Sequence, residues 1–231
     1  MIDPDLVSLT ITLKLAGVTT FILFLVGTPL AWWLARTRHT AGFLIEPLVA
    51  LPIVLPPTVL GFYLLILFSP SSGFGKLWTS ITGSTLAFTF EGLVIGSVIY
   101  SLPFYVQPLQ VAFEGVKQDL LDAAATLGAG PLDRFINIVA PLCRRGFVVA
   151  GTLAFAHTVG EFGIVLMIGG NIPGETRVLS IALFNHVETL QYGRAHLMAA
   201  GLLVFSFVLL LAVYTLNRQR PGQSKRLSIG S

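Results

Sequence analysis

Two ionisable side chains stand deep in an apolar stretch of the sequence. His157 and Glu161 are four residues apart, so on a helix they would share one face and could meet. Buried carboxylates of this kind serve as proton or sodium sites in carriers. The pair therefore leaves open an ion-coupled secondary transporter, with Glu161 as the only acidic residue deep in a predicted span.

Other kinds of chemistry lack the residues they need. No nucleophile, base and orienting group occur together, and the single cysteine, Cys143, has no Cys/His cluster with zinc spacing around it. A phosphate-binding loop is also missing, because Gly75-Lys76 is followed by Leu77 and lacks the upstream glycine. The sequence predicts a chain that is not an enzyme, binds no cofactor or metal, and does not itself bind or hydrolyse ATP.

The most ordered polar segment is DLLDAAATLGAGPLDRFINIVAPL, within residues 114–146. Leu121, Ala124, Ala125 and Gly128 follow helical spacing and form a face of small and apolar side chains, against which another backbone can pack closely. The glycines that follow can end this helix, and Pro131 suits the first turn of a second one. We expect a short helix, a sharp turn and another short helix that stops near Pro141.

The elements that hold these residues are predicted to be membrane spans. Hydrophobic residues make up 54% of the chain and charged residues 11%, with a mean hydropathy of +0.83, against roughly a quarter charged in soluble domains. The sequence thus predicts an all-α, polytopic membrane protein with one domain over residues 1–231. The five predicted spans are 6–35, 44–68, 92–113, 147–170 and 195–217.

Basic residues set the expected orientation. Ten of them fall in the loops after the first and third spans and in the tail: Arg36, Arg38, Lys117, Arg134, Arg144, Arg145, Arg218, Arg220, Lys225 and Arg226. The alternate loops hold only Lys76, Arg177 and Arg194. The positive-inside rule therefore places the N-terminus outside and the 114–146 loop in the cytoplasm. The formal net charge of +3 is explained by this asymmetry, so no nucleic-acid partner is expected.

Two outer loops are expected. Residues 69–91 are rich in Gly and Ser, with Trp78 placed as an interfacial aromatic residue would be. The other loop, 171–194, contains an amphipathic stretch at 179–190, which suits a short helix that is either interfacial or re-entrant.

The 114–146 loop resembles a known signature. Asp122-Ala123-Ala124, Gly128 after three residues, Ile138 after nine more and then Pro141 are similar to the E-A-A-x3-G-x9-I-x-L-P motif of ABC importer permeases, with Asp122 for Glu and Ala140 for Leu. In that family the loop forms coupling helices that dock into a cytoplasmic ATPase subunit. The resemblance implies this role for Asp122, Ala123, Ala124, Gly128, Ile138 and Pro141.

Three further stretches narrow the resemblance to molybdate permeases: LPIVLPPTVLG at 51–61, GEFG at 160–163 and NIPGETR at 171–177. This implies a multi-pass protein of the bacterial inner membrane that pairs with a second copy of itself and two ATPase subunits. It also implies an extracytoplasmic binding protein that delivers the oxyanion, and a surround of membrane lipid. Molybdate is the first expectation, with tungstate and sulfate as alternatives.

The prolines and the neutral polar residues of the spans suggest where the cargo passes. Pro52, Pro56 and Pro57 interrupt the second span, and freed backbone in a membrane must be buried in protein or face a wet cavity. The kinked helix is therefore either a packing feature or a lining of the pathway. Neutral groups suit a dianion in transit better than a tight cationic site or a carboxylate. The pathway or gate candidates are Pro56, Pro57, Ser97, Ser101, Thr152 and Thr158. His157 and Glu161 are expected to support the gate without touching the cargo.

Overall fold

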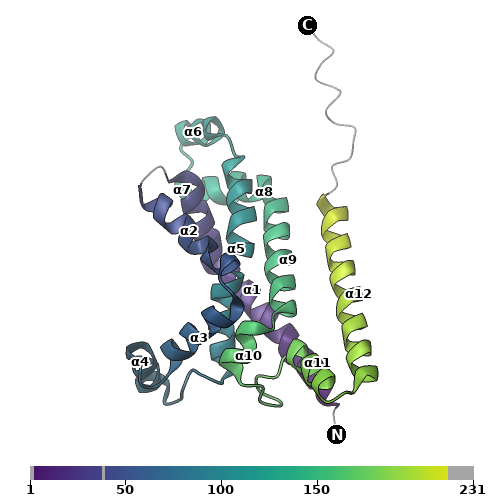
Figure 1. Ribbon diagram of the computed structural model, residues 1–231. Coiled ribbons are helices and arrows are strands. Elements are labelled where there is room, and N and C mark those ends of the chain that lie inside the picture. The colour runs from purple at the N-terminus through teal and green to yellow at the C-terminus, as the bar shows by residue number, and fades with distance from the viewer. Residues whose placement is uncertain (1–2, 38–39, 218–231) are drawn as a thin grey trace.

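The computed structural model describes residues 3–37 and 40–217, and all regular elements in these ranges are helical (Figure 1). This confirms the all-α class. Arg38 and the four basic residues of the tail lie outside the described residues. The helices are α1 (Pro4–Arg36), α2 (Thr40–Val54), α3 (Pro57–Phe68), α4 (Gly73–Thr82), α5 (Phe90–Glu114), α6 (Gln118–Thr126), α7 (Pro131–Arg134), the π-helical η1 (Phe135–Val139), α8 (Ala140–Leu142), α9 (Arg144–Gly160), α10 (Gly163–Gly169), α11 (Leu179–Glu188) and α12 (Tyr192–Asn217).

Three of these helices, α1, α5 and α12, are each long and apolar enough to cross a membrane. Two bent pairs pass the same test, which raises the count to five if each pair is one span. One pair is Gly42–Val54 with Pro57–Phe68, bent by 111°, and the other is Pro131–Leu142 with Arg144–Gly160, bent by 75°. Several spans are therefore present, some of them broken.

The second and fourth predicted spans are both broken; the prolines predicted the interruption of the second, whereas the break in the fourth was not predicted. In the second, α2 ends at Val54 and α3 begins at Pro57, because proline cannot donate to the preceding turn and disfavours helix just before it. In the fourth, α9 ends at Gly160 and Glu161 takes an extended conformation, with ψ 137°, before α10 begins. Both breaks put non-helical backbone inside an apolar segment.

The short helices and the ends of the long ones gather at two opposite ends of the molecule (Figure 1). The helices α6, α7 and α8 lie at the same end of the molecule as the last turn of α12. The start of α1 lies at the opposite end, with α4 and α11. Segments predicted for one side of the membrane thus lie together, as an odd number of crossings requires.

The two loops at the α4 end are more ordered than their compositions suggest. Ser72 caps α4 by accepting a hydrogen bond from the Gly75 amide at 2.8 Å, so the Gly- and Ser-rich loop contains a helix that the sequence analysis missed. The expected helix at 179–190 is present as α11. It packs against α1 and α12 and buries Leu179, Ile181 and Ala182, so one face rests on the protein.

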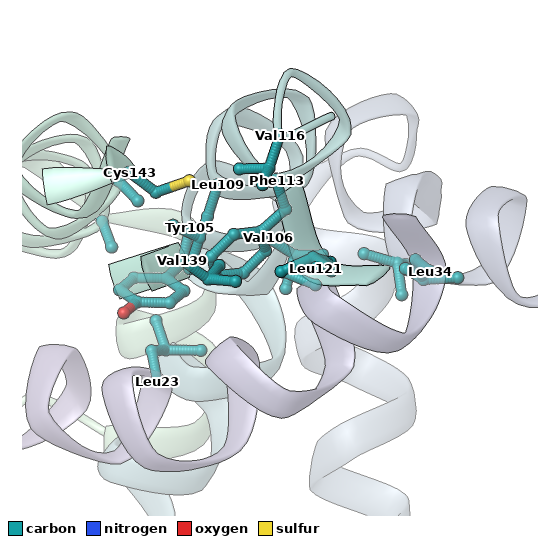
Figure 2. Close-up of a cluster of buried hydrophobic side chains, with 14 residues drawn as sticks. Leu23, Leu34, Tyr105, Val106, Leu109, Phe113, Val116, Leu121, Val139 and Cys143 are labelled. Carbon is teal, nitrogen blue, oxygen red and sulfur yellow. The ribbon is translucent and has the colours of Figure 1, made fainter. Parts of the chain in front are cut away.

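Buried side chains form two cores. The first core lies near α6 and joins α1, α5 and α9 to the 114–146 loop (Figure 2). Its buried side chains include Leu34, Phe113, Leu121 and Val139. The second core lies toward the α4 end and joins α1, α3, α5, α10 and α11 through side chains such as Leu15, Phe68 and Ile164. The helices α1 and α5 contribute to both.

Candidate functional site

The 114–146 loop folds as a helical hairpin. The helix α6 ends in a Schellman turn, in which the Ala129 amide donates to the Ala124 carbonyl and the Gly128 amide donates to the Ala125 carbonyl, both at 3.0 Å. Gly128 has φ +90°, a left-handed conformation that strains any residue with a Cβ. A Cβ on Gly128 would meet no atom within 4 Å, so within this chain the backbone conformation, and not close packing, requires glycine.

The second arm of the hairpin contains a wide turn. Phe135–Val139 is π-helical, with the Ala140 amide donating to the Phe135 carbonyl, and the chain stays helical to Leu142. The arm was expected to stop near Pro141 and continues one residue beyond it. Such π-turns often occur at functional sites, and here the turn comes just before a residue that lacks an amide donor. The chain then bends at Cys143 into α9.

Most of the predicted coupling residues lie on the exposed surface of this hairpin. Asp122, Ala123, Gly128 and Pro141 are exposed, whereas Ala124 and Ile138 are half-buried, and Ile138 packs against the first core. The predicted small face is split, because Leu121 points into the first core while Ala125 is exposed.

Large apolar side chains extend the exposed surface, namely Leu127, Leu132, Ile136 and Leu142. The most exposed of the four is Leu127, at 89%. A protein-docking surface has this character.

The two helix breaks touch each other. An ideal Cβ on Gly163 would lie 2.6 Å from the Pro57 Cβ, so only glycine lets the start of α10 approach the start of α3. Farther along, a Cβ on Gly61 would lie 2.8 Å from the Met167 Cβ. Pro57 is therefore half-buried against the second break, while its neighbour Pro56 is exposed.

Two of the pathway candidates, Ser101 and Thr158, form one polar cluster with His157 between α5 and α9. The Ser101 hydroxyl lies 3.0 Å from His157 Nδ1 and 2.9 Å from the Thr158 hydroxyl. The His157 ring stacks on Phe104, with centroids 3.8 Å apart. Thr152 is half-buried on α9 and has no side-chain hydrogen bond within the described residues.

The expected pair of His157 and Glu161 is absent. Because α9 ends at Gly160, Glu161 lies outside the helix, and the four-residue spacing no longer places it beside His157. Glu161 is only 5% exposed, and neither of its carboxylate oxygens has a hydrogen-bond partner in the described part of the chain.

Three polar groups surround this carboxylate: the Ser97 hydroxyl and the backbone amides of Ile164 and Val165. All three lie outside ordinary hydrogen-bond geometry. The Ser97 hydroxyl is also buried and has no partner among the described residues. The carboxylate is therefore enclosed beside the helix break.

Sequence reasoning missed two features of this site. The Gly163–Pro57 contact joins segments more than a hundred residues apart, and nothing in the local pattern of either indicates the other. Arg36 was counted only as a basic residue, yet its guanidinium contacts both α5 and α6. Its position at the end of an apolar run was the one available signal.

Comparisons with known proteins agree with this geometry. Residues 27–220 match the family described as binding-protein-dependent transport system inner membrane component. The chain is 54% identical to the molybdenum transport system permease protein ModB of Azotobacter vinelandii, over 96% of this chain and 98% of that one. It is 32% identical to ModB of Escherichia coli K12 over 96% and 98% of the two chains, and 32% identical to the sulfate transport system permease protein CysT of the same strain over 90% and 74%.

Two solved structures share the fold at low identity. A bacterial alginate ABC transporter in complex with its alginate-bound periplasmic protein matches with a TM-score of 0.73 and 17% identity, over 92% of this chain and 78% of that one. The MetNI methionine ABC transporter in an inward-facing conformation matches with a TM-score of 0.65 and 16% identity, over 94% and 97%.

Proposed function

This chain belongs to the family of inner-membrane components of binding-protein-dependent transport systems, and from that premise we propose that it moves molybdate. It is the permease subunit of an ABC importer in the bacterial inner membrane. The proposal that molybdate is the cargo rests on the 54% identity to a molybdenum permease along nearly the whole length of both chains. The comparisons give no support to an ion-coupled carrier.

The partners follow from the surfaces that this chain leaves open. The exposed hairpin of α6 to α8 suits docking to an ATPase subunit, which would bind ATP and Mg²⁺ in place of this chain. Large apolar side chains on α2 and α3, among them Phe43, Leu48, Val54, Phe62 and Tyr63, are exposed in the single chain. We propose that a second copy and membrane lipid cover such faces, so that the complex contains two permeases and two ATPases.

The orientation is proposed from charge. With the hairpin in the cytoplasm, the start of α1 and the α4 and α11 loops face outward, where an oxyanion-binding protein would deliver the cargo. Arg36, Lys117, Arg134, Arg144 and Arg145 then all lie on the cytoplasmic side, as the positive-inside rule requires.

The pathway is proposed to pass the contact between the two helix breaks. Non-helical backbone inside a membrane is tolerated where protein buries it or where it lines a cavity, and the two breaks concentrate it in one place. The nearby polar groups are mainly hydroxyls and an imidazole, which can hydrogen-bond to an oxyanion without the strong attraction of a fixed cation. Glu161 is proposed to support this region from its enclosed position without touching the dianion.

Reconstitution tests the function directly. The permease is combined with its ATPase and binding protein in liposomes, and uptake of molybdate, tungstate and sulfate is measured with ATP inside or omitted. We expect ATP-dependent molybdate uptake that also requires the binding protein. Uptake driven by a proton or sodium gradient without ATP would contradict the proposal. Calorimetry of the binding protein with the three anions identifies the preferred cargo.

A further inference from the structure

A chain of side-chain contacts links the end of α1 to the coupling hairpin. The Arg36 guanidinium lies over the Trp32 ring, 4.7 Å from its centroid. Its Nη2 atom donates to the carbonyls of Val116 at 3.0 Å and Phe113 at 3.3 Å. These carbonyls belong to the last turn of α5 and the link to α6, where helical partners run out.

The same guanidinium reaches α6. Arg36 Nη1 donates to Gln118 Oε1 at 3.1 Å, and Gln118 Nε2 donates in turn to Asp122 Oδ1 at 2.9 Å. Because an amide has one acceptor end and one donor end, the bond from Arg36 fixes which end of Gln118 faces Asp122. Asp122 is the acidic residue of the predicted coupling motif.

We propose that Arg36 is a positioning residue for coupling. It holds Gln118, and through Gln118 the Asp122 carboxylate, in a fixed place relative to the ends of α1 and α5. A displacement of α6 by the ATPase then moves the ends of these two spans with it. The inference rests on the proposed function in that it needs an ATPase to act on α6.

Arginine suits this place better than lysine. A planar guanidinium can stack on an indole while it donates to several acceptors in fixed directions. A lysine ammonium keeps the positive charge that sets topology but is a compact group on a flexible stem, so it cannot reproduce the stack and all three bonds at once. Arg36→Lys therefore separates the positioning role from the topological one.

The experiment compares four variants of the whole complex in liposomes. Arg36→Lys removes the planar guanidinium with its several N–H donors and keeps the positive charge. Gln118→Leu removes both bonds of the amide, whereas Gln118→Glu keeps an acceptor for Arg36 and loses the donor to Asp122. Arg145→Gln is the control, because this exposed arginine is also on the cytoplasmic side and donates no described hydrogen bond.

Two quantities are measured. The first is the ratio of the ATP hydrolysis rate with molybdate-loaded binding protein to the rate without binding protein, and the second is backbone hydrogen exchange of residues 118–126. We expect Arg36→Lys, Gln118→Leu and Gln118→Glu to assemble and to lose about fivefold or more of the stimulation, whereas Arg145→Gln should keep it. Exchange in 118–126 should become faster in Arg36→Lys and stay unchanged in Arg145→Gln.

Stimulation in Arg36→Lys equal to that of the unmodified complex would overturn the proposal, as would an equal loss in Arg145→Gln. If the unmodified complex did not respond to molybdate-loaded binding protein, the proposed cargo would fail. The exchange measurement would still decide on Arg36, because it requires only the assembled complex.

Discussion

The contact between the two broken spans predicts a sharp difference between two glycines. Gly163 begins α10 against Pro57, whereas Gly160 ends α9 with no atom within 4 Å of an added Cβ. We therefore expect Gly163→Ala to damage the permease and Gly160→Ala to leave it intact. The two changes add the same methyl group three residues apart.

The size of the effect follows from the spacing. Non-bonded carbon atoms are best placed about 3.5–4.0 Å apart, and the alanine Cβ would stand 2.6 Å from the Pro57 Cβ. The starts of α3 and α10 must therefore separate by roughly 1 Å, since a proline ring cannot rotate away. Overpacking of this kind costs about 1–3 kcal/mol.

The assay measures both stability and transport. The midpoint of thermal unfolding of the purified complex should fall by several degrees in Gly163→Ala, by roughly 2–4 °C for each kcal/mol in a chain of this size. Molybdate uptake per assembled complex should also fall, because the breaks are proposed to line the pathway. Equal midpoints and equal uptake in the two variants would refute the contact between the breaks.

Three other predictions test the hairpin, the orientation and the buried carboxylate. In Gly128→Ala, the stimulation of ATP hydrolysis by the binding protein should be lost, because a φ of +90° costs an alanine about 1–2 kcal/mol. Gly130→Ala should retain the stimulation, because Gly130 has a φ of −69°. Equal stimulated hydrolysis in both variants would contradict the Schellman turn. A reporter inserted near Ser72 should be periplasmic and one fused after Ser231, outside the described residues, cytoplasmic; reversed signals would refute the orientation. Glu161→Gln should retain appreciable uptake and Glu161→Leu should lose uptake or assembly, because leucine offers nothing to the polar groups beside it; loss of uptake in a fully assembled Gln variant would contradict the supporting role.

Local sequence patterns were sufficient wherever one segment determines its own structure. The small-residue spacing before Gly128 predicts the helix and its turn, since the Schellman bonds join residues within five positions of one another. The apolar runs of α1, α5 and α12 predict spans for the same reason. The prolines at 52, 56 and 57 indicate that the second span is disturbed, but the 111° bend depends on what packs against α3.

The pairing of His157 with Glu161 shows why local patterns fail elsewhere. Helical spacing holds only while the helix continues, and residues 160–163 form a break whose conformation is stabilised by contacts with α3. The Arg36 contacts are invisible in the sequence for a similar reason, because Gln118 lies 82 positions away along the chain. In both cases the deciding contact is between distant segments.

The two cores explain how a change at the hairpin can reach the helix breaks. Leu121 and Val139 anchor the hairpin in the first core, while Ile164 of α10 and Leu64 of α3 lie in the second core beside the breaks. The hairpin and the breaks do not share a core, but α1 and α5 contribute to both cores, so a displacement can pass along these helices as well as along α9, which runs from the hairpin to the second break. Protein interiors are close-packed, and such helices move as stiff bodies. Arg36 joins α6 to the ends of α1 and α5, at the place where a displacement of the hairpin can enter these two helices.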